Sequence, residues 1–469
     1  MIITQINDAL WTYLLIGVLV ICGLWFTFKT KGVQFRMVGE MFRLLGDSAT
    51  TGRKEKKEKR KYQNISSFQA FAVSVATRVG TGNLAGVATA IAIGGPGSVF
   101  WMWVIALLGS ATAFVESTLA QLFKKRNKES FIGGPAYYIK KGLHCNWLSV
   151  TFAVLLTITF GFAYNSIQSN TITDAMEEAF GLSPMLVAII LSATALIIVF
   201  GGIHRIANVS AFLVPIMAVG YFILVVVIII MNYELIPYVF KVIITNAFGL
   251  EQSVGGAIGA TIMTGVKRGL FSNEAGEGSA PNVAATATVS HPVKQGLIQA
   301  LGVFTDTLLV CSCTAFVILI SGLYKVPELN GIALTQSALE SEIGSAGPTF
   351  IAIAIFLFAF SSIIGNYYYG EANIRFLTSK KYVLTVYRIL SAGVVVFFGS
   401  LAALETVWNF GDLFMALITI CNLIAIIALG KYAFKLLDDY RAQKKRGIKE
   451  PVFRKSQFPE IEKELEAWD

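Results

Sequence analysis

Eleven stretches of the 469-residue chain are apolar over the length of a membrane-spanning helix. Crossing a bilayer takes about 20 mainly apolar helical residues. The predicted spans are residues 9–30, 66–93, 97–122, 148–179, 183–201, 206–232, 252–282, 294–322, 347–378, 382–402 and 405–436. Charged residues make up 14% of the chain, against about 25% in soluble domains. We therefore predict an all-α polytopic membrane protein with about eleven transmembrane helices.

The formal net charge of +9 comes from lysines and arginines that gather in a few loops. Residues 29–64 hold eleven of them, residues 123–147 hold six and the chain from Lys431 holds ten, whereas the opposite loops hold two, Lys241 and Lys325. Cytoplasmic loops carry such an excess of positive charge. We expect a cell-membrane protein with its N-terminus outside, its C-terminus in the cytoplasm and no nucleic-acid partner. Binding of RNA or anionic lipid by the basic run is the weaker alternative.

Two predicted helices, residues 66–93 and 252–282, are interrupted by glycines and polar residues at mid-membrane depth. Each opens a group of five helices, and because five is odd the second group enters the membrane from the opposite side, as an inverted repeat requires. The predicted parts are an extra N-terminal helix (1–30), a basic cytoplasmic loop (31–64), the first repeat (65–232), the second repeat (252–436) and a cytoplasmic tail (437–469). Neither the loop nor the tail is apolar enough to form a domain.

The first interruption consists of Val79, Gly80, Thr81, Gly82 and Asn83. Backbone groups in lipid must be satisfied internally, so a broken helix is tolerated only inside protein or beside a polar cavity. An unwound segment here would offer amide groups to a carboxylate and carbonyl oxygens to a cation. Close helix packing by the glycines is the alternative. The neighbouring Arg78 favours a functional site, because a charge at that depth is costly.

The second interruption lies in TIMTGVKRGLFSNEAGEGSAPN, residues 261–282, where two cations and two carboxylates stand among glycines. A single stretch of this kind is compatible with packing alone. Two of them, each opening a half of the protein, indicate a ligand site between the halves. Glu116 and Asp306 lie within other predicted helices and are candidate partners of Arg78 or Lys267.

Two further predicted helices carry polar side chains at places that suit a ligand. The fourth helix has amides at Asn165, Gln168 and Asn170, which suit a zwitterion, with hydrogen bonding between helices as the alternative. The ninth helix has adjacent hydroxyls at Ser361 and Ser362. Paired hydroxyls suit a hard cation such as sodium, although serines in membrane helices also bond their own backbone.

Signatures of enzymes and metal sites fail on inspection. GTGNLAG at Gly80 is one residue too long for a dinucleotide-binding loop, and GATIMTGVK at Gly259 is not a phosphate-binding loop. The five cysteines have no CxxC spacing, and the three histidines have no ligand spacing. We expect no cofactor, no enzyme activity, and histidines at solvated or interfacial positions. A channel is the rival function from another class.

Four long motifs resemble those of the alanine or glycine:cation symporter family. They are VATRVGTGNLAGVATAIAIGGPGSVFWMW, FIGGPAYYI, GVKRGLFSNEAGEGSAPN and FSSIIGNYYYGE, and the likeness runs from about Ile65 to the end of the eleventh predicted helix. The resemblance implies a leucine-transporter-type fold, in which one extra helix precedes a ten-helix inverted repeat. It also implies uptake of small neutral amino acids coupled to sodium or, in some members, to protons.

Motif by motif, the resemblance assigns the substrate carboxylate to the amides around Thr81 and Gly82. It completes the substrate pocket with Thr77, Gln168 and a helix break near Gly265. The sodium site that it implies consists of the carbonyls of Ala76 and Val79 with the hydroxyls of Ser361 and Ser362.

One position departs from the family pattern, because this chain has Asn366 where members often have tryptophan. A carboxamide leaves more room than an indole and adds both a donor and an acceptor, which makes glutamine an alternative main substrate. Otherwise Asn366 bonds a neighbouring helix and a residue such as Phe271 closes the pocket. We predict a sodium-coupled symporter that imports alanine or glycine by alternating access within a lipid bilayer. Proton coupling is the alternative for the coupling ion.

Overall fold

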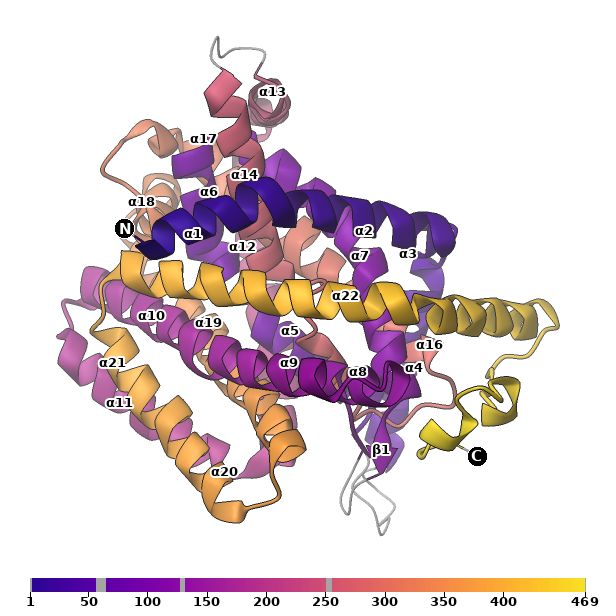
Figure 1. Ribbon diagram of the computed structural model, residues 1–469. Coiled ribbons are helices and arrows are strands. Elements are labelled where there is room, and N and C mark those ends of the chain that lie inside the picture. The colour runs from indigo at the N-terminus through magenta and orange to yellow at the C-terminus, as the bar shows by residue number, and fades with distance from the viewer. Residues whose placement is uncertain (1, 56–64, 127–130, 250–254, 469) are drawn as a thin grey trace.

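The computed structural model describes residues 2–55, 65–126, 131–249 and 255–468, and helices dominate this part of the chain (Figure 1). Its one small sheet is the antiparallel hairpin of β1 (Lys125–Arg126) and β2 (Phe131–Ile132). The first half of the chain forms α1 (Ile2–Leu10), α2 (Ile16–Lys29), α3 (Val33–Arg36), α4 (Val38–Glu55), α5 (Ser67–Arg78), α6 (Val87–Gly94), α7 (Ser98–Leu122), α8 (Pro135–Gly142), α9 (Asn146–Ile158), α10 (Asn165–Phe180), α11 (Pro184–Val199), α12 (Gly202–Met231) and α13 (Ile236–Ala247).

The second half forms α14 (Gly255–Asn273), α15 (Ala280–Ala284), α16 (Val293–Val303), α17 (Ser312–Ser321), α18 (Gly331–Ile343), α19 (Ala346–Leu377), α20 (Lys381–Arg388), α21 (Val396–Ser400) and α22 (Leu404–Lys445). Wider π-helical turns continue several of these helices, namely η1 (Trp11–Leu15), η2 (Gly82–Gly86), η3 (Thr159–Tyr164), η5 (Phe304–Cys311) and η7 (Ile389–Val395). Short 3-10 turns are η4 (Tyr233–Leu235), η6 (Leu323–Lys325), η8 (Lys455–Gln457) and η9 (Glu462–Glu464).

Eight described helices are long and apolar enough to cross a membrane, judged by length and composition. They cover Ile3–Lys29, Ser98–Leu122, Asn146–Phe180, Arg205–Met231, Val293–Ser321, Ala346–Leu377, Lys381–Ser400 and Leu404–Lys445. The three remaining predicted spans are α11, which has 16 residues, and the two interrupted helices, which their breaks divide into shorter pieces. The predicted all-helical membrane protein is thereby confirmed, whereas the count of eleven spans stays a prediction.

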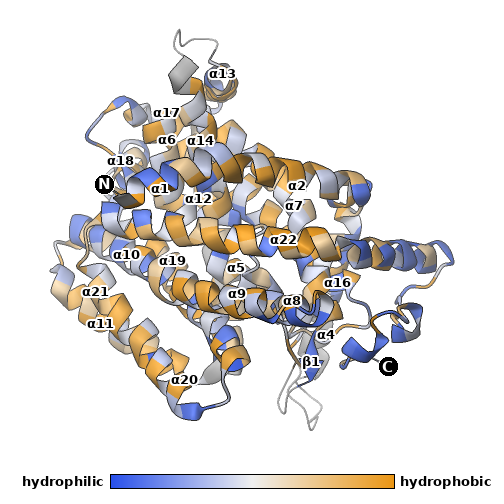
Figure 2. Cartoon of the chain, viewed as in Figure 1, coloured by the Kyte–Doolittle hydropathy of each residue, from blue (hydrophilic) through white to orange (hydrophobic). Residues whose placement is uncertain are grey.

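The helices form a bundle whose long elements run side by side (Figure 1). In this view α22 crosses the middle beside α1 and α2, with the N-terminus and α18 at the left and α3, α4 and the C-terminus at the right. The middle of α2, α11 and α22 is largely apolar, whereas the C-terminal end of α22 and the tail are polar (Figure 2). Exposed side chains such as Ile189 and Ile197 on α11 and Phe212 on α12 belong to this apolar outer surface. A bilayer covers such a surface, because exposing it to water is unfavourable.

The first predicted break is present between α5 and η2. Ser66 begins α5 with a capping box, and the helix ends at Val79, whose ψ of 94° is extended rather than helical. Helical geometry returns at Thr81 and Gly82, so the break is shorter than the five residues predicted. The interruption confirms the interpretation of the glycines as a place where the helix opens.

The second break lies elsewhere than predicted. The expectation of a break near Gly265 is wrong, because α14 is continuous to Asn273 and the chain leaves helical geometry at residues 274–279. A Cβ atom on Gly265 would lie 2.5 Å from the Ser98 carbonyl oxygen, so this glycine serves close packing of α14 on α7. Positive φ angles occur at Glu274 (55°), Gly276 (96°) and Gly278 (79°).

The predicted basic loop and tail contain more structure than the sequence indicated. Residues 33–36 and 38–55 form α3 and α4, while residues 56–64 of the loop lie outside the described part. The tail begins after α22 ends at Lys445 and folds back on the bundle, where Phe453, Phe458 and Trp468 are buried. The boundary predicted at residue 437 therefore lies inside α22.

Candidate functional site

The four predicted sodium ligands lie together where α19 passes the break after α5. Ser362 Oγ lies 2.9 Å from the Ala76 carbonyl oxygen and 3.4 Å from the Val79 carbonyl oxygen. Ser361 Oγ lies 3.3 Å from the same Ala76 oxygen. Both hydroxyls also donate to the Phe358 carbonyl one turn earlier, at 2.8 and 3.1 Å. Four neutral oxygens therefore converge on one place, which suits a hard monovalent cation.

The amide groups at the break are held by two side chains. Gln168 Oε1, on α10, accepts hydrogen bonds from Thr81 N at 3.0 Å and from Thr81 Oγ1 at 2.8 Å. Asn83 Oδ1 accepts from Gly80 N at 2.8 Å. The break therefore presents backbone and hydroxyl donors to oxygen acceptors, and a carboxylate is a stronger acceptor of the same kind.

Gly80 lies at the contact between the cation ligands and Gln168. A Cβ atom at this position would lie 2.4 Å from Ser362 Oγ and 2.8 Å from Gln168 Oε1. At Gly82 a Cβ atom would lie 3.0 Å from the ring of Phe271 and 3.2 Å from the Ser272 backbone. The glycines therefore let the broken helix approach α10, α14 and α19 more closely than side chains would permit.

Asn83 connects the first break to two other helices. Its Nδ2 donates to Asp306 Oδ1 at 2.7 Å and to Ser272 Oγ at 3.2 Å, and Ser272 Oγ donates to Asp306 Oδ2 at 2.6 Å. Thr307 Oγ1 adds a further hydrogen bond to Asp306 at 2.9 Å. Among the described residues Asp306 forms no direct ion pair with Arg78 or Lys267, and hydrogen bonds satisfy the carboxylate instead.

Thr77 and Asn366 lie on the helices that also carry the cation ligands. Thr77 Oγ1 lies 2.8 Å from the hydroxyl of Tyr369 and donates to the Ser74 carbonyl at 2.7 Å. A Cβ atom on Gly365 would lie 2.3 Å from Thr77 Cγ2. Gly365, which directly precedes Asn366, therefore packs closely against Thr77. Asn366 is 1% exposed, and neither its Oδ1 nor its Nδ2 has a hydrogen-bond partner within the described chain. A buried amide without partners is costly unless a ligand satisfies it.

An aromatic group borders the break on the side of α14. The rings of Phe271 and Tyr164 lie 4.8 Å apart, and the rings of Phe271 and Trp408 also lie 4.8 Å apart. The guanidinium of Arg268 stacks over Trp408 at 4.2 Å. Phe271 was predicted, whereas Trp408 and Tyr369 were missed. The sequence signal that could have indicated Trp408 is its place near Asn409 and Asp412 within an otherwise apolar helix.

The cations of the two interrupted helices find partners that the sequence did not indicate. Lys267 Nζ and Arg268 Nη2 lie 2.8 and 2.7 Å from the same carboxylate oxygen of Asp412 on α22. Arg78 donates to the Gln299 carbonyl oxygen at 3.3 Å and forms no ion pair among the described residues. Asp412 was missed although it is an isolated carboxylate in an apolar span, which is a usable signal.

Glu116 and the polar amides of α10 serve the packing of helices. Glu116 accepts from Asn422 Nδ2 at 2.8 Å and from Gly276 N at 3.3 Å, so it caps the second break. Asn165 donates to the hydroxyl of Ser391 at 3.2 Å, and Asn170 donates to the Ala402 carbonyl at 2.8 Å. Of the three amides proposed for α10, Gln168 alone reaches the break, and the other two follow the alternative of hydrogen bonding between helices.

Both ends of the site are closed in this structure. None of the ten non-glycine residues assigned to it is more than 4% exposed; they are Ala76, Thr77, Val79, Thr81, Asn83, Gln168, Phe271, Ser361, Ser362 and Asn366. On one side α18 covers η2, where Thr335 Oγ1 donates to the Leu84 carbonyl at 3.1 Å. On the other side Thr288 N donates to the Ile65 carbonyl at 3.1 Å. A site enclosed at mid-depth between two closed ends suits alternating access.

Comparison with known proteins finds related transport proteins along the whole chain. A family model described as the sodium:alanine symporter family matches residues 1–455. The probable sodium/glutamine symporter GlnT of Bacillus subtilis is 52% identical over 96% of this chain and 92% of its own length. The amino-acid carrier protein AlsT of the same species is 51% identical over 99% and 96%, respectively. The sodium/proton-dependent alanine carrier protein of Bacillus sp. PS3 is 39% identical over 84% and 92%.

Solved structures are more distant. A manganese transporter of Eremococcus coleocola aligns over 85% of this chain and 84% of its own with 14% identity and a TM-score of 0.49, which is too low to test the predicted inverted repeat. The family assignment rests on sequence: the family model covers nearly the whole chain, and relatives at 39–52% identity cover most of it. The chain therefore belongs to the sodium:alanine symporter family and is a cation-coupled amino-acid symporter, not an enzyme.

Proposed function

We propose that this protein imports a small neutral amino acid, alanine or glycine, together with sodium. The observation that carries the proposal is the acceptor position at the break, where Gln168 Oε1 bonds both the amide and the hydroxyl of Thr81. A substrate carboxylate oxygen that displaced Gln168 would gain the same two donors, and its negative charge would strengthen both bonds. The substrate would then lie beside Gly80, Gly82 and Asn83.

The sodium ion would bind next to this position, between the carbonyls of Ala76 and Val79 and the hydroxyls of Ser361 and Ser362. Binding would require the two hydroxyls to turn their hydrogens away from these carbonyls, so that all four oxygens face the ion. Gly80 separates the ion from the substrate by a single residue without a side chain. Coupling follows if ion and substrate both favour the closed state, since a ligand shifts an equilibrium only by its differential affinity.

Glutamine is a second candidate substrate, and two observations favour it. The buried amide of Asn366 has a free donor and a free acceptor within the described chain, which matches the carboxamide of a glutamine side chain. A relative that shares 52% of its residues with this chain is named as a probable sodium/glutamine symporter. Proton coupling is the alternative for the ion, because a 39% identical relative is named as sodium/proton-dependent.

Uptake by proteoliposomes tests the proposal. Labelled alanine, glycine and glutamine are supplied with a sodium gradient, a proton gradient or neither. We expect a sodium gradient to concentrate alanine or glycine above its outside level, which a channel cannot do. Accumulation driven by protons alone would replace sodium as the coupling ion, and preferential accumulation of glutamine would replace the small amino acids as the main substrate.

A further inference from the structure

The chain after α22 is folded onto the end of the bundle rather than left in solvent. Phe453, Phe458, Leu465 and Trp468 are 3%, 0%, 1% and 8% exposed. These apolar side chains are spaced irregularly along a polar segment, and their burial stabilises the docked position of residues 446–468. We call this segment the docked tail.

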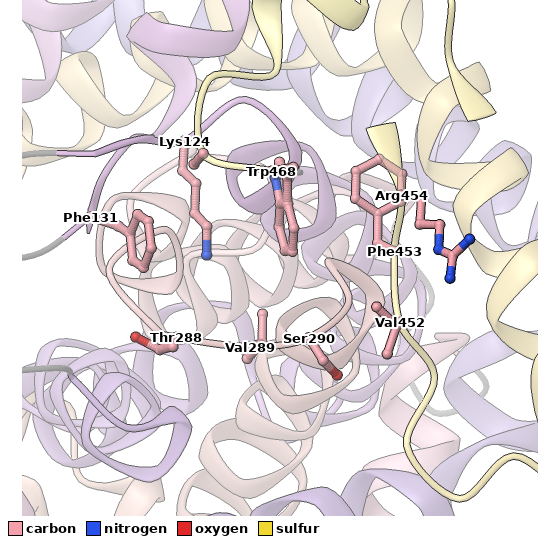
Figure 3. Close-up of a pocket in the computed structure, with 10 residues that line it drawn as sticks. Lys124, Phe131, Thr288, Val289, Ser290, Val452, Phe453, Arg454 and Trp468 are labelled. Carbon is pink, nitrogen blue, oxygen red and sulfur yellow. The ribbon is translucent and has the colours of Figure 1, made fainter. Parts of the chain in front are cut away.

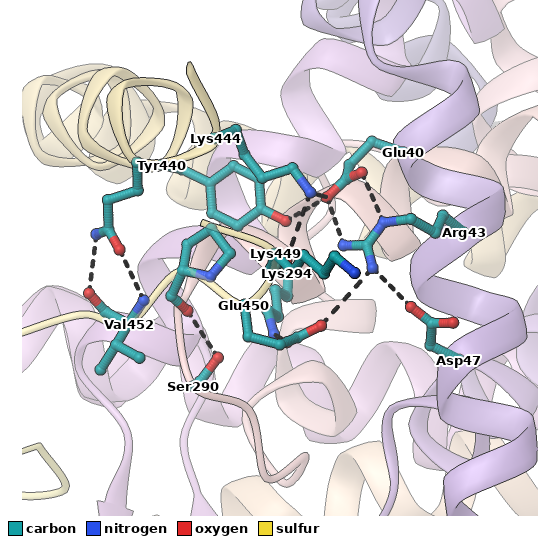
Figure 4. A network of polar contacts seen from close by, with 12 residues as sticks. Glu40, Arg43, Asp47, Ser290, Lys294, Tyr440, Lys444, Lys449, Glu450 and Val452 are labelled. Carbon is teal, nitrogen blue, oxygen red and sulfur yellow. Dashed lines mark hydrogen bonds and ion pairs between the residues drawn. The ribbon is translucent and has the colours of Figure 1, made fainter. Parts of the chain in front are cut away.

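The docked tail is bonded to residues 285–292, the gate loop that joins α15 to α16. Phe453 N donates to the Ser290 carbonyl at 2.9 Å. Ser290 Oγ donates to the Pro451 carbonyl at 2.8 Å (Figure 4). At the base of the tail, His291 Nε2 lies 3.1 Å from Asp439 Oδ2 on α22. The gate loop is thus fixed to the tail and to the helix from which the tail departs.

Lys124 connects the end of the docked tail to the same loop. Its Nζ lies 4.6 Å from the Trp468 ring centroid and 4.0 Å from that of Phe131 (Figure 3). It also donates to the Ala287 carbonyl at 3.1 Å. The indole of Trp468 donates to the carbonyls at the end of α7, those of Gln121 and Leu122, at 3.1 Å each. Removing the indole would take away a cation–π partner and two hydrogen bonds together.

A polar network fixes the beginning of the docked tail to α4 and α16 (Figure 4). Glu450 pairs with Lys294 on α16 and lies 3.6 Å from Arg43 on α4. Glu40 on α4 accepts from Tyr440 at 2.6 Å and pairs with Lys444 at 3.3 Å, both on α22. Burial alone would raise the pKa of Glu40, but hydrogen bonds from Arg43 and Tyr440 hold it at about 2, so its charge persists at neutral pH.

The gate loop is also bonded to the start of the broken helix that carries the ligand site. Thr288 N donates to the Ile65 carbonyl at 3.1 Å, directly before α5 begins. Gln121 Nε2 donates to the Ala287 carbonyl at 3.0 Å from the opposite side. The gate loop therefore lies between the inner end of α5 and the docked tail, and α5 cannot move away from α15 without breaking this contact.

A pocket partly open to solvent lies between the tail and the gate loop. Its volume is about 440 Å³, and it is lined in part by Lys124, Val289, Val452, Phe453 and Trp468 (Figure 3). The contact between tail and gate loop therefore borders solvent along one side. The tail is docked at the surface of the bundle and is not enclosed in its core.

We propose that residues 446–468 are an autoinhibitory latch that holds the inner end of the ligand site closed. By the distribution of lysines and arginines, this end of the bundle faces the cytoplasm. Detachment of the tail frees the gate loop, the gate loop releases Ile65, and the inner half of α5 swings outward from α15. The latch rests on the alternating-access cycle proposed above, but it predicts a structural change that is measurable without transport.

The first experiment measures the rate at which a maleimide labels Ile65→Cys in the full chain with its native cysteines replaced. Trp468→Ala combined with Phe453→Ala removes the main tail contacts, and Lys463→Ala, an exposed tail position, is the matched control. We expect labelling to accelerate at least fivefold in the double variant and to stay unchanged in the control. Equal rates in a double variant that elutes as a folded monodisperse species would overturn the latch.

A second experiment does not depend on the folding of the double variant. Ser290→Cys and Val452→Cys face the same cavity and are joined by oxidation, which fixes the tail to the gate loop. We expect the cross-linked protein to lose at least nine-tenths of its sodium-driven uptake and to regain it on reduction. Full uptake while cross-linked would overturn the latch. Absence of uptake in the reduced protein would refute the proposed substrate or ion, and the labelling rate would then decide on the latch alone.

Discussion

Ser362 Oγ and the Ala76 carbonyl oxygen lie 2.9 Å apart, although 286 positions separate the two residues in the chain. The contact joins α19, in the second half of the chain, to α5, which forms the first part of the broken helix. A cation held at this point would stabilise the approach of these two helices.

Replacing both hydroxyls, Ser361→Ala with Ser362→Ala, should weaken sodium activation of uptake. Two of the four oxygen ligands are lost while the carbonyls of Ala76 and Val79 remain. We expect the half-saturating sodium concentration to rise about tenfold or more, equivalent to about 1.4 kcal/mol. Initial uptake rates over a sodium series measure this change. An unaltered sodium dependence in a folded double variant would remove these hydroxyls from the site.

Gly80→Ala should abolish most uptake, because its Cβ would lie 2.4 Å from Ser362 Oγ and 2.8 Å from Gln168 Oε1. Overpacking of this kind costs about 1–3 kcal/mol and would separate α5 from α19. Gly220→Ala on α12 is the matched control, since a Cβ there meets nothing within 4 Å. Uptake per folded protein is compared for the two variants. Equal activity would show that the break is not packed against Ser362 during transport.

Asn366→Trp should reduce glutamine uptake about tenfold or more and change alanine and glycine uptake much less. The indole fills the space that a longer side chain needs and removes the unpartnered amide. Competition of each amino acid with labelled alanine measures the substrate profile before and after the change. If the wild-type protein ignores glutamine and the variant keeps the wild-type profile, Asn366 does not shape specificity.

The orientation predicted from the distribution of positive charge leads us to expect opposite labelling of two exposed lysine positions. Lys325→Cys, in the turn before α18, should react with an impermeant maleimide added to intact cells. Lys463→Cys, in the docked tail, should react only after the membrane is opened. Both tests use a chain without its native cysteines. Reaction of the second position in intact cells would reverse the assigned orientation.

Acidification should loosen the docked tail. Burial lowers the pKa of His291 from its ordinary value, although Asp439 opposes this effect. The other groups around the ring are Lys294, Tyr440 and Phe453. His291 therefore binds a proton more readily when the tail is detached than when it is docked. Docking is fully stabilised above the ordinary histidine pKa, about 6.5, and weakens as the pH falls toward the lowered pKa of the docked state. Proteolysis of the tail should be faster at pH 5.5 than at pH 7.5.

The matched variant for this pH effect is His291→Gln, whose amide nitrogen reaches the position of Nε2, keeps a donor toward Asp439 and cannot titrate. Its tail should be cut at similar rates at both pH values. A pH dependence that persists in this variant would assign the effect to another group. The buried position of His291 also corrects the sequence expectation that all three histidines are solvated or interfacial, because the docked tail covers it.

Local patterns predicted much of the site, and contacts between distant segments account for the rest. The first break and the candidate role of Ser361 and Ser362 were predictable because glycines, paired serines and a charge at mid-depth are visible in short motifs. The carbonyls of Ala76 and Val79 were added to the proposed cation site only through the family resemblance. The second break was misplaced because Gly265 packs a helix closely while Gly276 opens one, and both are simply glycines in the sequence. Lys267 pairs with Asp412, and Trp468 docks on residues near the end of α7. In both cases the partners lie more than 140 positions apart, so no local sequence pattern predicts the contact.

The four oxygens assigned to sodium belong to two carbonyls and two hydroxyls, and none of these groups carries a charge. An ion bound there keeps its full positive charge, and a zwitterionic amino acid beside it adds none. A cycle that carries one sodium ion with one such substrate therefore moves one elementary charge across the bilayer. A membrane potential of 100 mV, negative inside, contributes about 2.3 kcal/mol to each such cycle. The cell's voltage thus becomes a driving force for accumulation in its own right, beside the sodium gradient.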